Sequence, residues 1–146
     1  MKKIDYDNLN ILKNDILFFL EHITIPNNPC IILDLDNTII DSNGYFIKPI
    51  YEICLKCLNL NITIFIITGR VLNNQNLENT YNQINKLYYF VKQIYFRLPY
   101  LQNFYEYKKK ARYDIFLKGY TCIATIGDNI WDIGLFGGNG FIIPTI

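Results

Sequence analysis

The sequence of 146 residues has very few of the side chains on which many hydrolases rely. Ser42 is its one serine and His22 its one histidine. A Ser-His-Asp triad would need both, and no G-x-S-x-G motif surrounds Ser42. A zinc site of the H-E-x-x-H type needs two histidines and is excluded. Serine and histidine chemistry is therefore disfavoured.

The four cysteines, Cys30, Cys54, Cys57 and Cys122, do not supply an obvious nucleophile either. None is followed six positions later by arginine, so the C-x5-R loop of thiolate phosphatases is absent. Cys54 and Cys57 form a C-x-x-C motif on the apolar side of a predicted helix. We interpret them as buried, reduced thiols, with half of a zinc site or a redox pair as the alternative. This usage fits a reducing compartment.

The composition is that of one globular domain without a membrane segment. Hydrophobic residues make up 51% of the chain and the net charge is +1, which argues against a polybasic arm or an acidic tail. No credible signal peptide follows Met1, and the apolar run Ile64–Ile67 is far too short to cross a bilayer. We therefore predict a cytoplasmic, single-domain protein over residues 1–146. Residues 1–29 form an N-terminal helical extension, with an amphipathic helix over 7–23.

Short apolar runs alternate with helical segments along the rest of the chain. This alternation predicts an α/β, Rossmann-like parallel sheet of five strands with helices on both faces, because parallel strands need crossover connections. The predicted strands are Cys30–Leu35, Ile62–Ile67, Ile94–Phe96, Cys122–Ile126 and Phe141–Ile143, and the predicted helices between them are 48–59, 76–92, 108–118 and 130–136.

Carboxylates follow two of these strands. Asp34 and Asp36 lie at the end of the first predicted strand, and Asp128 follows the fourth. In a sheet of this kind ligands bind outside the carboxyl ends of the strands, and carboxylates gathered there favour a hard divalent cation such as Mg²⁺. An EF-hand is excluded, since Thr38 stands where a ligand belongs and Ile39 where the loop needs glycine.

Groups suited to phosphate occur near the same edge. The Thr68 hydroxyl and the Gly69 amide follow the second predicted strand, and Lys108 offers an ammonium group. Lys109 and Lys110 adjoin it, so a solvated lysine-rich helix face remains the alternative interpretation. With serine, histidine and cysteine disfavoured, an aspartate that attacks phosphorus is the most economical reading.

Four motifs in order resemble those of the haloacid dehalogenase (HAD) superfamily of phosphotransferases. They are Asp34-Leu35-Asp36-Asn37-Thr38, Ile67-Thr68-Gly69-Arg70, Lys108, and Gly127-Asp128-Asn129-Ile130-Trp131-Asp132. The stretch from Arg97 to Asp132 is most similar to the class B-like and class III acid phosphatases. The resemblance spans about residues 30–136, and four motifs together are far more specific than D-x-D-x-T alone.

The resemblance implies a role for each motif residue. Asp34 would be the nucleophile that forms an aspartyl-phosphate, and Asp36 the general acid and then base. Asp34, Asp128 and the backbone carbonyl of Asp36 would bind Mg²⁺, with Asp132 supporting the metal through its waters. Thr68, Gly69 and Lys108 would bind the phosphoryl oxygens.

One departure from the family and one feature of the charge distribution bear on the substrate. Little of the chain remains for a cap domain, so we expect a homo-oligomer or a macromolecular substrate to close the site. The segment from Lys86 to Lys118 carries eight basic residues and many tyrosines, a surface that could receive a nucleic-acid end. The alternative is a helix and a strand whose aromatic residues belong to the core. The motifs together predict a Mg²⁺-dependent phosphomonoesterase that acts through an aspartyl-phosphate on a phosphorylated small molecule or a nucleic-acid end. The alternatives are a polynucleotide end-phosphatase or nucleotidase, and a non-catalytic binding or storage protein.

Overall fold

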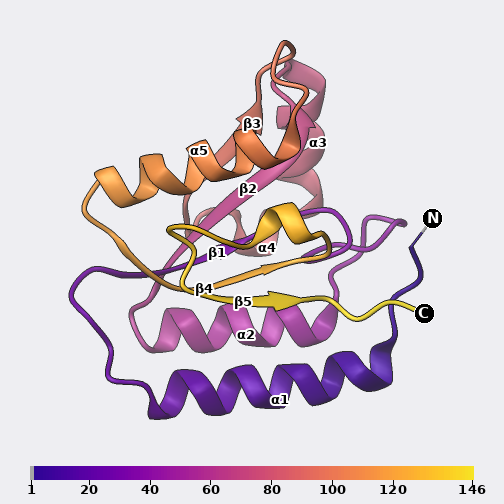
Figure 1. Ribbon diagram of the computed structural model, residues 1–146. Helices are drawn as coiled ribbons and strands as arrows, with labels where there is room; N and C mark the ends of the chain where they lie inside the picture. The colour runs from indigo at the N-terminus through magenta and orange to yellow at the C-terminus, as the bar shows by residue number, and fades with distance from the viewer. Residues whose placement is uncertain (1) are drawn as a thin grey trace.

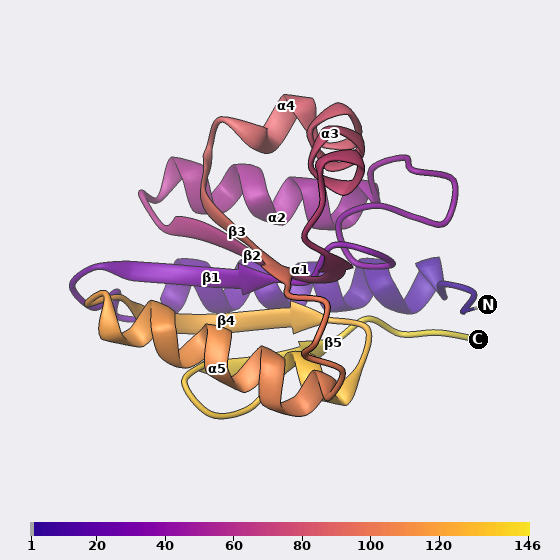
Figure 2. The same ribbon diagram turned by 90° about the horizontal axis from the view of Figure 1, so that it is seen from above.

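The computed structural model describes residues 2–146. Five strands form one parallel sheet in the order β3-β2-β1-β4-β5 (Figures 1 and 2). The strands are β1 (Pro29–Leu33), β2 (Thr63–Val71), β3 (Val91–Arg97), β4 (Thr121–Gly127) and β5 (Asn139–Ile142). The predicted α/β class, the five strands and their parallel arrangement are confirmed.

Helices cover both faces of the sheet. Helices α1 (Tyr6–His22) and α2 (Lys48–Asn59) lie on one face, and α5 (Phe104–Leu117) lies on the other (Figure 1). Alternate residues of β1 serve the two layers: Ile31 and Leu33 pack with α1 and α2, whereas Cys30 and Ile32 pack with α5. This alternation follows from the twofold period of a strand, and it explains why the central strands are apolar throughout.

The prediction of one long helix over 76–92 is wrong. The chain forms α3 (Asn74–Gln83) and the short α4 (Asn85–Tyr88), separated at Ile84, and then enters β3 at Val91. The buried side chains of Ile84 and Leu87 anchor this break on the α1–α2 face. Lys92 and Gln93 resemble helix residues, but β3 is an edge strand, where exposed polar side chains are tolerated.

The helix predicted over 130–136 is also too long. The chain forms only the 3-10 turn η1 (Ile130–Asp132). Gly134 and Gly138 have φ angles of 133° and 64°, which a continuous helix does not allow. Gly138 lies so close to β4 that an added Cβ would be 2.4 Å from the carbonyl oxygen of Cys122. This turn brings the chain back alongside β4 as β5.

The four cysteines are free thiols, and Cys54 and Cys57 are fully buried on α2, as predicted. Burial raises the pKa values of both thiols, that of Cys57 to about 12. The thiols are therefore protonated and packed in the core. Among residues 2–146, no helix has the length and apolar character needed to cross a membrane.

Candidate active site

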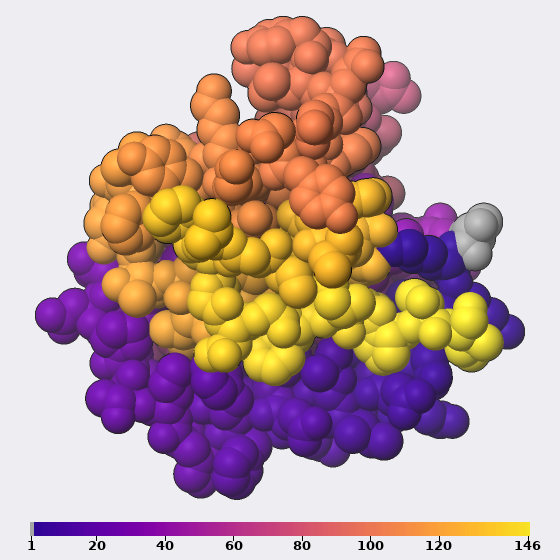
Figure 3. All heavy atoms as spheres, in the orientation of Figure 1, coloured from indigo at the N-terminus to yellow at the C-terminus, as the bar shows by residue number. Residues whose placement is uncertain are grey.

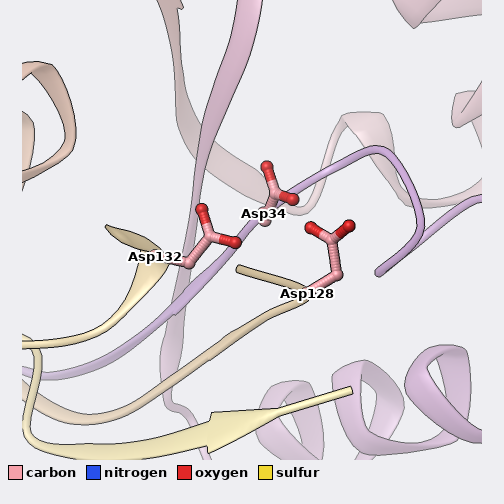
Figure 4. A group of neighbouring side chains, drawn as sticks. All are labelled: Asp34, Asp128 and Asp132. Atoms are coloured by element: carbon pink, nitrogen blue, oxygen red, sulfur yellow. The ribbon is translucent and has the colours of Figure 1, made fainter. Parts of the chain in front are cut away.

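Three buried carboxylates converge at the carboxyl edge of the sheet. Asp34 follows β1 and Asp128 follows β4, and these strands are direct neighbours, with Leu33 opposite Ile126. Asp132 comes from η1 and packs against Gly127, where an added Cβ would lie 2.2 Å from the Asp132 Cβ. One carboxylate oxygen from each aspartate lies within 4.8 Å of the others (Figure 4). This group offers three oxygen ligands to a hard cation.

Burial disfavours the ionised forms of two of these carboxylates, Asp34 and Asp132. Burial raises the pKa of Asp34 to about 7, and nearby Asp128 adds to the rise while Lys108 opposes it. Burial also raises the pKa of Asp132 above its ordinary value, with a further contribution from Asp34. Positive charge brought to this point would favour the ionised forms.

Lys108, which lies on α5, provides part of that positive charge. Its Nζ lies 2.9 Å from Asp34 Oδ1 and 2.8 Å from Asp132 Oδ1, and donates to the Ile67 carbonyl oxygen at 2.6 Å. Burial alone would lower the pKa of the ammonium, but these two carboxylates outweigh it and hold that pKa above its ordinary value. The side chain is 3% exposed, whereas Lys109 and Lys110 are exposed, so Lys108 is the lysine that reaches the site.

Asp36 lies at the mouth of the site, outside the three-carboxylate group. Its two carboxylate oxygens accept from Arg70 Nη2 at 2.8 Å and from Arg70 Nε at 3.0 Å. Arg70 Nη1 donates to Thr80 Oγ1 of α3 at 2.9 Å, so the pair is tied to that helix. The Asp36 side chain is half exposed and therefore open to solvent and substrate.

Thr68 and Gly69 lie within the last residues of β2, which continues to Val71, whereas the sequence predicts that they follow a strand ending at Ile67. Thr68 is buried, and its carbonyl oxygen accepts from the Tyr107 hydroxyl at 2.7 Å. The Phe104 ring covers Gly69 so closely that an added Cβ would lie 2.7 Å from Phe104 Cε1. A glycine is therefore needed here because of packing.

These residues surround a cavity of about 210 Å³ with one aromatic side. It is lined by Asp34, Asp36, Asn37, Gly69, Arg70, Phe104, Lys108, Asp128, Asn129 and Trp131. Phe104 and Trp131 stack with ring centroids 5.5 Å apart. A larger hollow of about 680 Å³ lies between α1 and α2, but none of the predicted site residues lines it. We therefore place the chemistry at the smaller cavity.

Phe104 and Lys2 were not predicted as site residues. Lys2 reaches the site because the two chain ends pair: Ile4 bridges Thr145, and the Ile146 amide donates to the Lys3 carbonyl oxygen at 2.8 Å. The space-filling view shows the two ends side by side (Figure 3). No sequence pattern indicates this pairing, whereas Phe104, four residues before Lys108, lies on the same side of an amphipathic helix.

The basic, tyrosine-bearing segment offers fewer free groups than its composition suggests. Lys108, Arg112 and Tyr107 are buried in the α5 layer. Arg97 donates to the carbonyl oxygens of Gly69 and Leu101. The remaining lysines and tyrosines are distributed over α4, β3, α5 and the loops beside them.

Comparisons with known proteins identify a family and a similar fold. A family model described as "HAD superfamily, subfamily IIIB (Acid phosphatase)" matches residues 47–139. Among curated proteins, no sequence matches the chain. A solved structure, "Structure of Pnkp1/Rnl/Hen1 complex", has a TM-score of 0.69 and 14% identity over 84% of this chain and 48% of that one. The chain thus spans about half of that protein, and the likeness shows the fold alone.

The family match includes Thr68, Lys108, Asp128 and Asp132. Asp34 precedes the matched residues, yet the structure brings its carboxylate to Lys108, Asp128 and Asp132. The fold therefore connects the first motif to the other three.

Proposed function

The chain belongs to subfamily IIIB of the HAD superfamily, the acid phosphatases. From this premise we propose that it is a phosphohydrolase, which hydrolyses phosphate monoesters with Asp34 as nucleophile and Mg²⁺ as cofactor. One observation carries the proposal. A buried carboxylate at the end of the central strand lies within ion-pair distance of a buried lysine and beside two further carboxylates, in an open cavity.

The reaction would take place in two displacements. An oxygen of Asp34 attacks phosphorus, the ester P–O bond breaks, and Asp36 gives its proton to the leaving alcohol. Water then attacks the aspartyl-phosphate and Asp36 takes its proton. The P–O bond to Asp34 breaks, which releases inorganic phosphate and restores the carboxylate. The exposed position of Asp36 at the cavity mouth suits contact with a leaving group.

The donor set fits a divalent cation. The three buried carboxylates carry more negative charge than Lys108 alone neutralises, and all their ligand atoms are oxygens, as Mg²⁺ prefers. Asp34, Asp128 and the Asp36 carbonyl would hold the ion, with Asp132 beside it. When bound, the ion would offset the charge of the phosphoryl group.

Lys108, Thr68 and Gly69 would orient the phosphoryl group. Lys108 would hold its oxygens as a point charge and reduce the repulsion between Asp34 and the anionic substrate. Thr68 and the Gly69 amide would add neutral donors. Because Lys108 comes from α5 and Thr68 from β2, the two elements must pack closely, as the Tyr107–Thr68 hydrogen bond indicates.

The test is phosphate release from p-nitrophenyl phosphate with Mg²⁺ and with a chelator. We expect turnover by the wild type with Mg²⁺, loss of turnover in Asp34→Asn, and little change in the control Asp7→Asn, which alters an exposed acid of α1. Mass spectrometry of acid-quenched protein should locate a phosphoryl group on the peptide with Asp34. Equal turnover by wild type and Asp34→Asn would refute the nucleophile, and an inactive wild type would favour the non-catalytic alternative.

The aromatic side of the cavity favours a second candidate, a nucleotidase or polynucleotide end-phosphatase. Phe104 and Trp131 offer a flat apolar surface beside the phosphoryl site, and the stacking of a base on such a surface contributes about 1–3 kcal/mol. Trp131→Ala should then lower kcat/KM for nucleotides or phosphorylated oligonucleotides but not for glycerol 2-phosphate. An equal decrease for both classes of substrate would count against this candidate.

A further inference from the structure

The ammonium group of Lys2 lies against the loop that carries Asp128. Its Nζ donates to the Asp128 carbonyl oxygen at 2.6 Å and to Asn129 Oδ1 at 2.6 Å, and lies 3.3 Å from Asp128 Oδ2. One side chain from the start of the chain thus contacts two successive residues of the fourth motif. The mechanism proposed above does not use these contacts.

The backbone that follows Lys2 is fixed by the other end of the chain. Ile4 bridges Thr145 in an antiparallel pair, and the Asp5 amide donates to the Pro144 carbonyl oxygen at 3.0 Å. We call this pairing of residues 3–5 with 144–146 the terminal clasp. Because the clasp follows β5, the neighbour of β4, it delivers Lys2 to the carboxyl end of β4.

Through Asn129 the contact extends to the rest of the loop. The Asn129 amide donates to Asp132 Oδ2 at 3.0 Å, and Asn129 Nδ2 donates to Asp128 Oδ1 at 3.2 Å. Lys2 therefore holds the residue that links the Asp128 and Asp132 carboxylates. Loss of Lys2 would free both the Asp128 carbonyl and the Asn129 side chain.

We propose that Lys2 is a positioning residue that holds Asp128 and Asn129 in the arrangement that binds the divalent cation. The inference rests on the metal site of the proposed function. The two shortest contacts of Lys2 are to neutral oxygens, so its main effect is on the geometry of the loop. Partners of this kind, one step removed from the metal, commonly change metal affinity by about 10–100-fold.

The sign of the effect separates positioning from simple electrostatics. If Lys2 acted only as a nearby positive charge, its removal would reduce repulsion and tighten binding of Mg²⁺. If Lys2 holds the loop, its removal weakens binding of Mg²⁺ even though a repulsive charge has been lost. Opposite outcomes are therefore expected from the two roles.

The experiment measures Mg²⁺ binding to the full chain by isothermal titration calorimetry, without substrate, for wild type, Lys2→Gln, Lys2→Arg and Lys3→Gln. Lys3→Gln is the matched control, because it removes the same charge from the adjacent, exposed residue. We expect about a tenfold weaker Kd in Lys2→Gln, recovery to within about twofold in Lys2→Arg, and no weakening in Lys3→Gln. Thermal unfolding checks that each variant is folded.

Turnover of p-nitrophenyl phosphate gives an independent readout. In Lys2→Gln the Mg²⁺ concentration for half-maximal activity should rise by the same factor as Kd, with kcat at saturating Mg²⁺ near the wild-type value. Unchanged or tighter binding of Mg²⁺ by Lys2→Gln would overturn the inference, as would equal weakening in Lys3→Gln or no binding by the wild type. A wild type that binds Mg²⁺ but releases no phosphate would overturn the proposed function instead, and the calorimetry would still decide the role of Lys2.

Discussion

Substitution of Lys108 by methionine tests how strongly the site depends on one buried charge. Methionine keeps most of the length of the side chain but removes the ammonium group that contacts Asp34, Asp132 and the Ile67 carbonyl oxygen. Both carboxylates would remain buried, each without its cation. The change therefore leaves each buried carboxylate either charged without a partner or protonated, and both outcomes cost folding free energy.

The expected size follows from these contacts. Removal of one partner from a buried ion pair costs about 3–5 kcal/mol, because the other partner stays desolvated. At about 2–4 °C per kcal/mol for a chain of this size, Tm should fall by about 10 °C. The controls Lys109→Met and Lys110→Met change exposed residues of the same helix, and each should alter stability by less than about 0.5 kcal/mol.

Urea unfolding in a chelator, at neutral pH, measures the difference directly. Added Mg²⁺ should restore part of the stability of Lys108→Met, because a cation bound by the carboxylates replaces some of the lost charge. If Lys108→Met unfolds within about 0.5 kcal/mol of the wild type in chelator, the Asp34–Lys108–Asp132 contacts do not carry the energy assigned to buried ion pairs.

Three further changes test other parts of the site. Gly69→Ala should lower turnover because its Cβ would lie 2.7 Å from Phe104 Cε1; the double variant Gly69→Ala/Phe104→Leu should recover part of it, and full activity of the single variant would contradict this packing. In chelator, the contribution of Asp34 to stability should be full below about pH 4 and decline as the pH rises towards 7, because burial raises the pKa of Asp34 to about 7 and the unfolded carboxyl loses its proton first. The slope is at most about 1.4 kcal/mol per pH unit for this group, and urea titrations should show a shallower slope in Asp34→Asn than in the wild type. Asp128→Asn should weaken Mg²⁺ binding in calorimetry, and an unchanged Kd would remove Asp128 from the ligand set.

Much of the fold could be predicted because the inner strands are apolar on both faces. In β1 and β4 the hydrophobic run ends abruptly at a carboxylate, so the pattern marks both the strand and the start of the site. The edge strand β3 was harder, because Lys92 and Gln93 face solvent and interrupt its apolar pattern. Local composition could not separate this strand from the helix before it.

The choice among Lys108, Lys109 and Lys110 depends on the phase of α5. The buried residues Tyr107, Ala111 and Ile115 recur every four positions, and Lys108 and Arg112 lie beside this stripe. The spacing of Ala111 and Ile115 therefore indicates which face of α5 is buried, and so favours Lys108 over Lys109 and Lys110. The contact of Lys2 with Asp128 had no such signal, since it depends on pairing between residues far apart in the sequence.

The central position of β1 has a consequence for how the site opens. Ile31, Ile32 and Leu33 are paired on both sides, with β2 and with β4, whereas β3 and β5 each have one neighbour. Hydrogen exchange at the β1 amides should therefore require global unfolding, while the edge strands exchange through smaller openings. Fraying of either edge would leave Asp34 in place, so loss of its environment should coincide with the cooperative unfolding of the whole domain.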